Sequence, residues 1–234
     1  MTAQKYIYRF SKEKTDGDRG LVSTLGGKGA NLAEMCSLNI PVPPGFTIST
    51  EVCNYFLQHS CFPDNFENSL FSYIKEIEKK LDFKFGDSKK PLLFSVRSGA
   101  RISMPGMMET VLNVGLTTQT IKGLANKIND KRFAYDSYRR LIMMYSDVVM
   151  EKAANLNNGI REHLDSMLIN IKNEKKITHD YELDSETLKE ICLKFKSEVG
   201  QILKVPFPDD PYEQLLGAIK AVFISWNGFR AKEY

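Results

Sequence analysis

Short apolar runs separated by polar and glycine-rich stretches predict a mixture of strands and helices in the first half of the chain. Residues 6–10 and 46–48 predict two short strands, because aromatic and β-branched residues cluster there between turn signals. Apolar residues at helical spacing predict a helix over 30–38. The segment 41–45 must end that helix, since proline cannot continue it. Two further helices are expected at about 50–58 and 65–81.

Polar side chains mark where some helices should begin. Ser49 or Thr50 is expected to cap the helix that runs to about residue 58, because either hydroxyl can accept a free backbone N–H. Asp184 or Ser185 is expected to do the same for a later helix.

Residues 92–96 give the clearest strand signal in the chain, and their apolar run predicts burial on both faces. The loop that follows, 97–108, contains two glycines, one proline and three methionines. Residues 111–114 are expected to return to the sheet.

From residue 117 onward the pattern is almost wholly helical. Helices are predicted near 118–127, 131–154, 160–174, 184–203 and 209–226. The fold class is therefore α/β, or more loosely α+β. Two subdomains of one module are expected: an α/β part over 1–116 and a helical part over 117–234.

Composition narrows the classes of protein that the chain can belong to. Its 234 residues carry 32 basic and 29 acidic side chains, a net charge of +3, which gives no case for a nucleic-acid partner. The four cysteines have no CxxC spacing, and the three histidines have no metal-site arrangement, so no metal ligands are assigned. Without a signal peptide or a membrane-length apolar stretch, a cytoplasmic location and no membrane partner are expected.

The turn Gly26-Gly27-Lys28-Gly29 is the first candidate for binding chemistry. Glycines let the backbone approach a ligand closely, and a helix that opens there offers unpaired N–H groups to an anion. The Walker A pattern fails, because Gly29 follows Lys28 and Val22 stands at the earlier glycine position; GxGxxG fails at Leu32. An ordinary glycine-rich helix entry with an exposed lysine remains the alternative.

Arg97 is the second candidate, since it directly follows the strongest predicted strand. Ligands of α/β sheets bind beyond the carboxyl ends of strands, and arginine can clamp phosphate oxygens with two hydrogen bonds. Arg101 lies on the same loop. Both arginines could instead belong to a surface ion-pair network. Methionines 104, 107 and 108 could fill a core or form part of a lid. Arg139 and Asp136 fit an ordinary pair along a structural helix.

Several motifs together resemble one known family, the pyruvate phosphate dikinases. They are LGGKGANLAEM (25–35), PVPPGFT (41–47), SVRSGAR (95–101), SMPGMM (103–108), FAYDSYRR (133–140), MYSDVVM (144–150) and AIKAVF (218–223). Phosphoenolpyruvate synthases share the Gly-Gly-Lys turn and the Ser-Val-Arg-Ser strand end. They lack the methionine-rich loop and the YDSYRR helix, so the dikinases are the better match. Glu109 stands where the family pattern has aspartate, which bears on loop detail.

The resemblance implies that the chain is the first part of an ATP-grasp nucleotide-binding domain. Lys28 would touch the phosphates of ATP, and Arg97 would hold the terminal phosphates and stabilise charge during their transfer. Arg101 and the loop residues Gly106, Met107, Met108 and Thr110 would complete the phosphate contacts, the loop closing over the nucleotide. These roles suit phosphoryl transfer, which depends on positioning and charge neutralisation.

The family reaction converts ATP, phosphate and pyruvate to AMP, pyrophosphate and phosphoenolpyruvate through a phosphohistidine. The resemblance implies that the phosphohistidine and pyruvate-binding domains, and the ligands for Mg²⁺, lie beyond Tyr234. It also implies a homodimeric full-length enzyme, and a 234-residue piece that does not catalyse the whole reaction. The alternatives are a stand-alone nucleotide-binding or regulatory module, or a phosphoenolpyruvate synthase-like relative.

Overall fold

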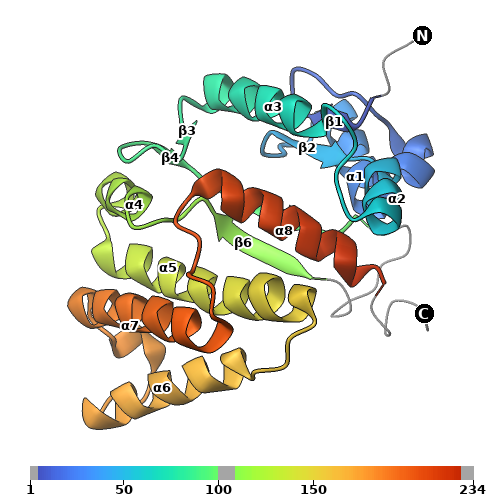
Figure 1. Cartoon of the computed structure of the whole chain (residues 1–234). Coiled ribbons are helices and arrows are strands. Elements are labelled where there is room, and N and C mark those ends of the chain that lie inside the picture. Colours follow the sequence, from blue (N-terminus) through green and yellow to red (C-terminus); the bar gives the residue numbers. More distant parts are fainter. Residues whose placement is uncertain (1–4, 100–108, 228–234) are drawn as a thin grey trace. The chain divides into compact units, whose positions relative to one another are not determined.

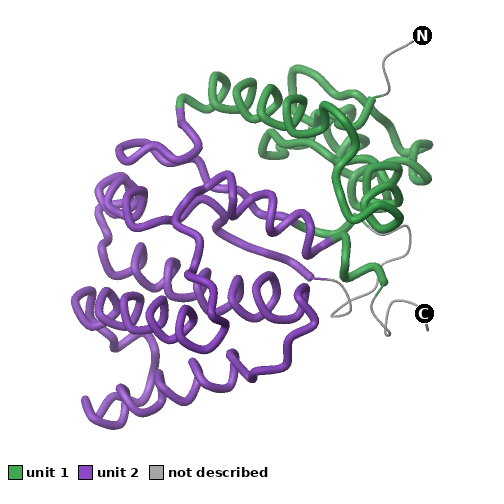
Figure 2. The backbone as a smooth tube through the Cα atoms, in the orientation of Figure 1, with its two compact units in different colours: residues 1–82, 97–108, 223–234 green, residues 83–96, 109–222 purple. Residues whose placement is uncertain are grey.

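Helices predominate in the structure, a computed structural model that describes residues 5–99 and 109–227 (Figure 1). The strands form small two-stranded sheets, so the chain is an α+β protein. The chain divides into two compact units (Figure 2). Unit 1 comprises 1–82, 97–108 and 223–234, and unit 2 comprises 83–96 and 109–222. The division into functional subdomains at residue 116 stays a prediction.

Unit 1 combines one antiparallel strand pair with three helices. The elements are β1 (Ile7–Phe10), α1 (Val22–Ser37), β2 (Gly45–Ile48), α2 (Thr50–His59) and α3 (Phe66–Leu81). In the strand pair, Ile7 lies opposite Ile48 and Phe10 lies opposite Gly45. Both strands were predicted from their apolar runs, and both are confirmed.

The core of unit 1 follows from the spacing of its apolar residues. Along α3, the buried side chains are Phe66, Leu70, Ile74 and Ile77, one turn apart, which places them on a single face. Phe66 also belongs to a cluster of four aromatic rings. The others are Phe56, Phe62 and Phe223, and the centroids of neighbouring rings lie 4.8 to 6.3 Å apart. Edge and tilted contacts of this kind add to the free energy that burial alone supplies.

Unit 2 is mainly helical. Its elements are β3 (Lys84–Phe85), β4 (Pro91–Leu92), β5 (Phe94–Arg97, whose last residue is assigned to unit 1), β6 (Thr110–Val114), α4 (Thr120–Ile128), α5 (Lys131–Tyr145), α6 (Ile160–Glu174), α7 (Ser185–Leu203) and α8 (Pro211–Ser225, assigned to unit 1 from Phe223 onward). Strand β3 pairs with β4 in parallel, and β5 pairs with β6. In Figure 1, α5, α6 and α7 lie side by side, with α7 against α5. Asp184 caps α7 as predicted, since its carboxylate accepts the N–H of Thr187 at 2.7 Å.

A buried glutamine joins α8 to the end of β6. Gln214 is 0% exposed, and its side-chain oxygen accepts the N–H of Gly115 at 3.0 Å. Its amide nitrogen donates to the carbonyls of Leu116 (3.0 Å) and Pro208 (2.9 Å). A fully bonded buried amide of this kind fixes the separation of the segments that it joins.

Two expectations about local structure in the first half of the chain are wrong. The run 92–96 is not one strand buried on both faces: it divides into β4 and β5, and Ser95 and Arg97 are exposed on alternate positions of β5. A short apolar run does not by itself distinguish one-sided from two-sided burial. The hydroxyl of Thr50 does not cap α2, because it donates to the Ser23 carbonyl at 2.7 Å, and Ser49 makes no capping bond either.

The long helix predicted over 131–154 changes its hydrogen-bond pattern part-way along. After α5 the backbone forms a π-helix, Ser146–Glu151, and then a short 3₁₀ turn, Lys152–Ala154. The buried carboxylate of Glu151 accepts backbone N–H groups of Asn158 and Ile160, which lie at the start of α6. The π-turn therefore directs an acidic side chain onto the unpaired N–H groups at the beginning of another helix.

Within the part of the chain that the structure describes, no helix is both long and apolar enough to cross a membrane. All four cysteines are free, and only Cys61 is exposed. Burial raises the pKa of the Cys53 thiol to about 12, and burial does the same for Cys192.

Candidate functional site

The glycine-rich turn opens a helical stretch as predicted, because Gly26 divides α1 into two parts. The second part begins directly after Gly26, earlier than the expected start at residue 30. Gly26 breaks the helix with φ 68° and ψ 171°, values that L-residues with a side chain scarcely adopt, and helical backbone resumes after it. The second part of α1 thus begins at the glycines, and exposed Lys28 lies in its first turn.

Gly26 contacts the loop that follows β5. A Cβ atom at position 26 would overlap the backbone carbonyl of Gly99, and a Cβ at Gly99 would lie 3.1 Å from the carbonyl oxygen of Leu25. Two segments that are distant in sequence therefore meet backbone to backbone in unit 1. Lys28 lies two residues after one side of this contact, and Arg97 lies two residues before the other.

Arg97 is the last residue of β5 and is exposed. Its place at a strand end is as predicted. Among the described residues, neither Arg97 nor Lys28 takes part in an ion pair. The geometry therefore gives no support within that part of the chain to the alternative that Arg97 belongs to a surface ion-pair network.

The other residues predicted to contact phosphate follow Arg97 in the sequence. Arg101, Gly106, Met107 and Met108 lie outside the described residues. Thr110 begins β6 in unit 2, where its side chain is half-buried. Beside it, the carboxylate of Glu109 lies 4.0 Å from the ammonium of Lys152.

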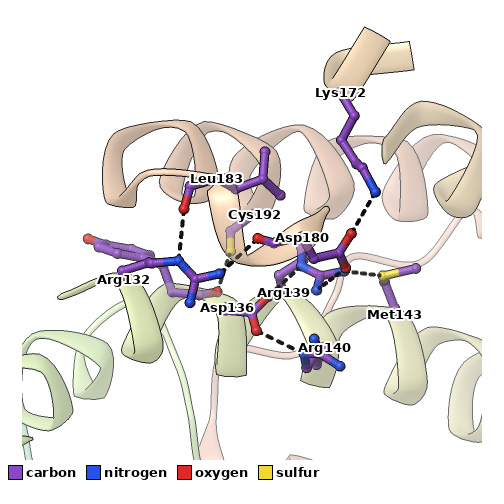
Figure 3. Close-up of polar contacts among 10 residues, drawn as sticks. Arg132, Asp136, Arg139, Arg140, Met143, Lys172, Asp180, Leu183 and Cys192 are labelled. Atoms are coloured by element: carbon purple, nitrogen blue, oxygen red, sulfur yellow. Dashed lines mark hydrogen bonds and ion pairs between the residues drawn. The ribbon is translucent and has the colours of Figure 1, made fainter. Parts of the chain in front are cut away.

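The arginine of the predicted structural helix is buried, and its pairing with Asp136 is confirmed. Arg139 in α5 is 3% exposed, and it donates to the carboxylates of Asp136 (2.6 Å) and Asp180 (3.1 Å) (Figure 3). Burial alone would raise the pKa of Asp136, but hydrogen bonds from Arg139 and Arg140 hold it below its ordinary value. The ionised form of Asp136 is therefore favoured, and its charge matches that of the buried guanidinium.

Asp180 extends the same group of contacts to a further helix. Lys172 of α6 donates to Asp180 at 2.9 Å, and Arg132 of α5 donates to the carbonyls of Asp180 and Leu183. Figure 3 shows these side chains converging between α5 and the segment that precedes α7. Each of these side chains bonds to another protein group, which is the arrangement of a structural network.

Within residues 5–99 and 109–227, no three His, Cys, Asp or Glu side chains gather as metal ligands would. His59, His163 and His179 are all exposed. His163 lies 2.9 Å from Glu198 across α6 and α7, a surface pair.

Comparison with known proteins decides between the families that share these motifs. The family model described as "Pyruvate phosphate dikinase, AMP/ATP-binding domain" matches residues 22–72 and 61–234. The chain belongs to this family. It is 44% identical to pyruvate, phosphate dikinase of Clostridium symbiosum over 98% of its length, and 45% identical to the chloroplastic enzyme of Flaveria trinervia over 100%. The Rhizobium meliloti enzyme is 44% identical over 98%.

The chain spans about a quarter of the length of these relatives, 25%, 24% and 25% respectively. The similarity therefore shows family membership for this quarter of the relatives' length. Sequence reasoning located the glycine turn and Arg97 but missed the contact between Gly26 and Gly99. The only signal for it was the presence of a second glycine just after the strand end.

Proposed function

We propose that the chain supplies part of the ATP-binding site of a pyruvate phosphate dikinase, within an ATP-grasp nucleotide-binding domain. The observation that carries the proposal is the meeting of the Lys28 turn with the Arg97 strand end through Gly26 and Gly99. Two exposed cations near one backbone contact suit a polyphosphate, which carries several negative charges along a short chain.

Each cation would have its own role. Lys28, in the first turn of the resumed helix, would meet phosphate oxygens together with backbone N–H groups of the glycine turn. Arg97 would hold the terminal phosphates with two parallel hydrogen bonds and offset the charge that develops as they transfer. Arg101, Gly106, Met107 and Met108 stay predicted phosphate contacts on the loop that follows Arg97, and Thr110, the first residue of β6, stays a predicted contact as well.

For the longer protein, we propose the reaction of its relatives: ATP, phosphate and pyruvate are converted to AMP, pyrophosphate and phosphoenolpyruvate through a phosphohistidine. Domains that carry the phosphohistidine and bind pyruvate are the proposed partners, in a homodimer. Mg²⁺ stays a prediction, and because the described residues hold no ligand cluster for it, no step is assigned to it. A cytoplasmic location also stays a prediction, and some relatives are named as chloroplastic.

Calorimetric titration of the chain with Mg-ATP tests the proposed site. We expect saturable binding by the wild type, and at least about a tenfold loss of affinity in Lys28→Ala and in Arg97→Ala, since a hydrogen bond to a charged group contributes about 1.5–3 kcal/mol. Lys79→Ala is the matched control: it removes an exposed charge from the same unit, on α3, and should bind as the wild type does.

Three results of this titration would count against the proposed site. Binding that survives both substitutions would show that Lys28 and Arg97 do not hold the nucleotide. An equal loss of affinity in Lys79→Ala would show that the losses arise from the change in net charge and not from contacts of Lys28 and Arg97 with the nucleotide. Absence of binding by the folded wild-type chain would contradict the expectation that Lys28 and Arg97 hold a polyphosphate without the rest of the ATP-binding site.

A further inference from the structure

The backbone contact between Gly26 and Gly99, called here the glycine contact, joins the two segments that carry the proposed phosphate-binding cations. We propose that the glycine contact is a positioning device: it fixes the separation of Lys28 and Arg97 before any ligand arrives. This inference rests on the proposed function for its purpose, but the positioning itself can be measured without a ligand.

Steric arguments make glycine necessary on one side of the contact and favourable on the other. At Gly26, φ 68° with ψ 171° lies in a region that is essentially restricted to glycine. Independently, a Cβ there would overlap the Gly99 carbonyl, a backbone group that cannot rotate away. At Gly99, a Cβ would lie 3.1 Å from the Leu25 carbonyl oxygen, which is tighter than an ordinary contact.

The α1 side of the glycine contact is anchored within unit 1. The Thr50 hydroxyl at the start of α2 donates to the Ser23 carbonyl at 2.7 Å. Gly29 packs on β2, since a Cβ there would lie 2.7 Å from the Thr47 methyl carbon. The turn that carries Lys28 is therefore fixed on both sides of Gly26.

Chain geometry carries this restraint to the two cations. Lys28 and Arg97 are each two residues from the contact, which is at most about 7 Å along an extended chain. With the backbones held together, their side chains cannot separate freely, and less conformational entropy is lost when both engage one polyphosphate. Without the contact, each segment would bring its cation independently.

A spin-label measurement tests the positioning without ligand. Labels at Lys28→Cys and Arg97→Cys, in a Cys61→Ser background that removes the exposed native thiol, report the distance between the two positions. We expect a narrow distribution with Gly26, and one at least about twice as wide in Gly26→Ala. Gly45→Ala is the matched control: its Cβ would overlap the Phe10 ring in the same unit, but a side chain can move aside.

Titration with inorganic tripolyphosphate, on chains without the labelling cysteines at positions 28 and 97, tests whether the glycine contact serves ligand binding. Gly26→Ala should lower the affinity at least about tenfold, and it should add little to the loss already caused by Arg97→Ala, because the contact acts through that residue. A purely structural role would instead lower the melting temperature without this non-additivity.

The distance distribution tests the positioning of Lys28 and Arg97, and the tripolyphosphate affinity tests its role in binding. A narrow distribution in folded Gly26→Ala, with unchanged tripolyphosphate affinity, overturns the inference. A distribution that widens in a chain that binds no tripolyphosphate, even as wild type, supports the positioning while the proposed function fails. If Gly26→Ala does not fold, Gly99→Ala, whose added Cβ makes the milder clash, takes its place in both measurements and is judged by the same criteria.

Discussion

Two arginines, one in each unit, show how burial decides what the same side chain does. Arg97 ends a strand, is exposed, and forms no ion pair among the described residues. Arg139 is 3% exposed, and its donors are taken up by Asp136, Asp180 and the Met143 sulfur. A buried guanidinium must bond to protein groups, because leaving it unpaired costs several kcal/mol, whereas an exposed one remains available to a ligand. The buried charge of Arg139 therefore serves stability, whereas the exposed charge of Arg97 is the one proposed to serve binding.

Arg139→Ala should produce the largest effect, about 3–5 kcal/mol less free energy of unfolding, because it leaves Asp136 and Asp180 without their buried partner. Urea unfolding followed by far-ultraviolet circular dichroism measures the loss, since unit 2 is mainly helical.

Arg140→Ala is the matched control for this prediction. Arg140 bonds to the same carboxylate of Asp136 but is 59% exposed, so its removal should cost at most about 1 kcal/mol. Arg97→Ala should leave stability within about 0.5 kcal/mol of wild type. Equal losses in all three variants would contradict the division between a stabilising and a binding arginine.

Gln214→Ala sharpens the same comparison with an uncharged group in unit 2. The substitution leaves the Gly115 N–H and the carbonyls of Leu116 and Pro208 without their partner in a buried site. We expect a loss of about 2–3 kcal/mol in the free energy of unfolding. Gln201→Ala, on the exposed face of α7, should change it by less than about 0.5 kcal/mol. A loss below 1 kcal/mol for Gln214→Ala would mean that water replaces the amide.

Asp16→Asn tests a surface-proximal ion pair in unit 1, where the smallest effect is expected. Burial opposes ionisation of Asp16, but hydrogen bonds from the Arg9 side chain and N–H outweigh it and lower its pKa from 3.8 to about 2. A carboxylate with a depressed folded pKa stabilises the fold above pH 3.8 and loses that contribution as the pH falls toward 2.

The measurement is the melting temperature between pH 2 and 7, followed by fluorescence of Trp226, the single tryptophan, which belongs to unit 1. Wild type should lose stability between about pH 4 and 2, and Asp16→Asn should lose less over the same range. Parallel acid profiles for wild type and Asp16→Asn would contradict the assignment.

Periodicity predicted most of the helices and short strands, because each buries one apolar face that repeats visibly in the sequence. It could not predict the π-helix Ser146–Glu151, since the run looks helical and only the bonding of Glu151 to the start of α6 distinguishes it. Thr50 misled for a related reason: a hydroxyl suited to capping found a tertiary acceptor on Ser23. Long-range partners are invisible to a local pattern.

The candidate site divides in the same way. Lys28 and Arg97 could be proposed from local chemistry and family resemblance, because a glycine turn and a strand end each have a recognisable pattern. That the two segments touch depends on Gly26 and Gly99, whose contact has no local signature. The sequence therefore predicts the components of the site better than their assembly.

The glycine contact has a consequence for which mutations this region can accumulate. Every coding change at Gly26 introduces a Cβ, so even the smallest available replacement meets the Gly99 carbonyl. In a library of random variants, replacements larger than alanine at position 26 should be rejected by a screen for folded protein and by a screen for nucleotide binding alike. Positions 28 and 97, whose side chains are exposed, should be rejected only by the second. The two screens together would separate the residue that builds the site from those that use it.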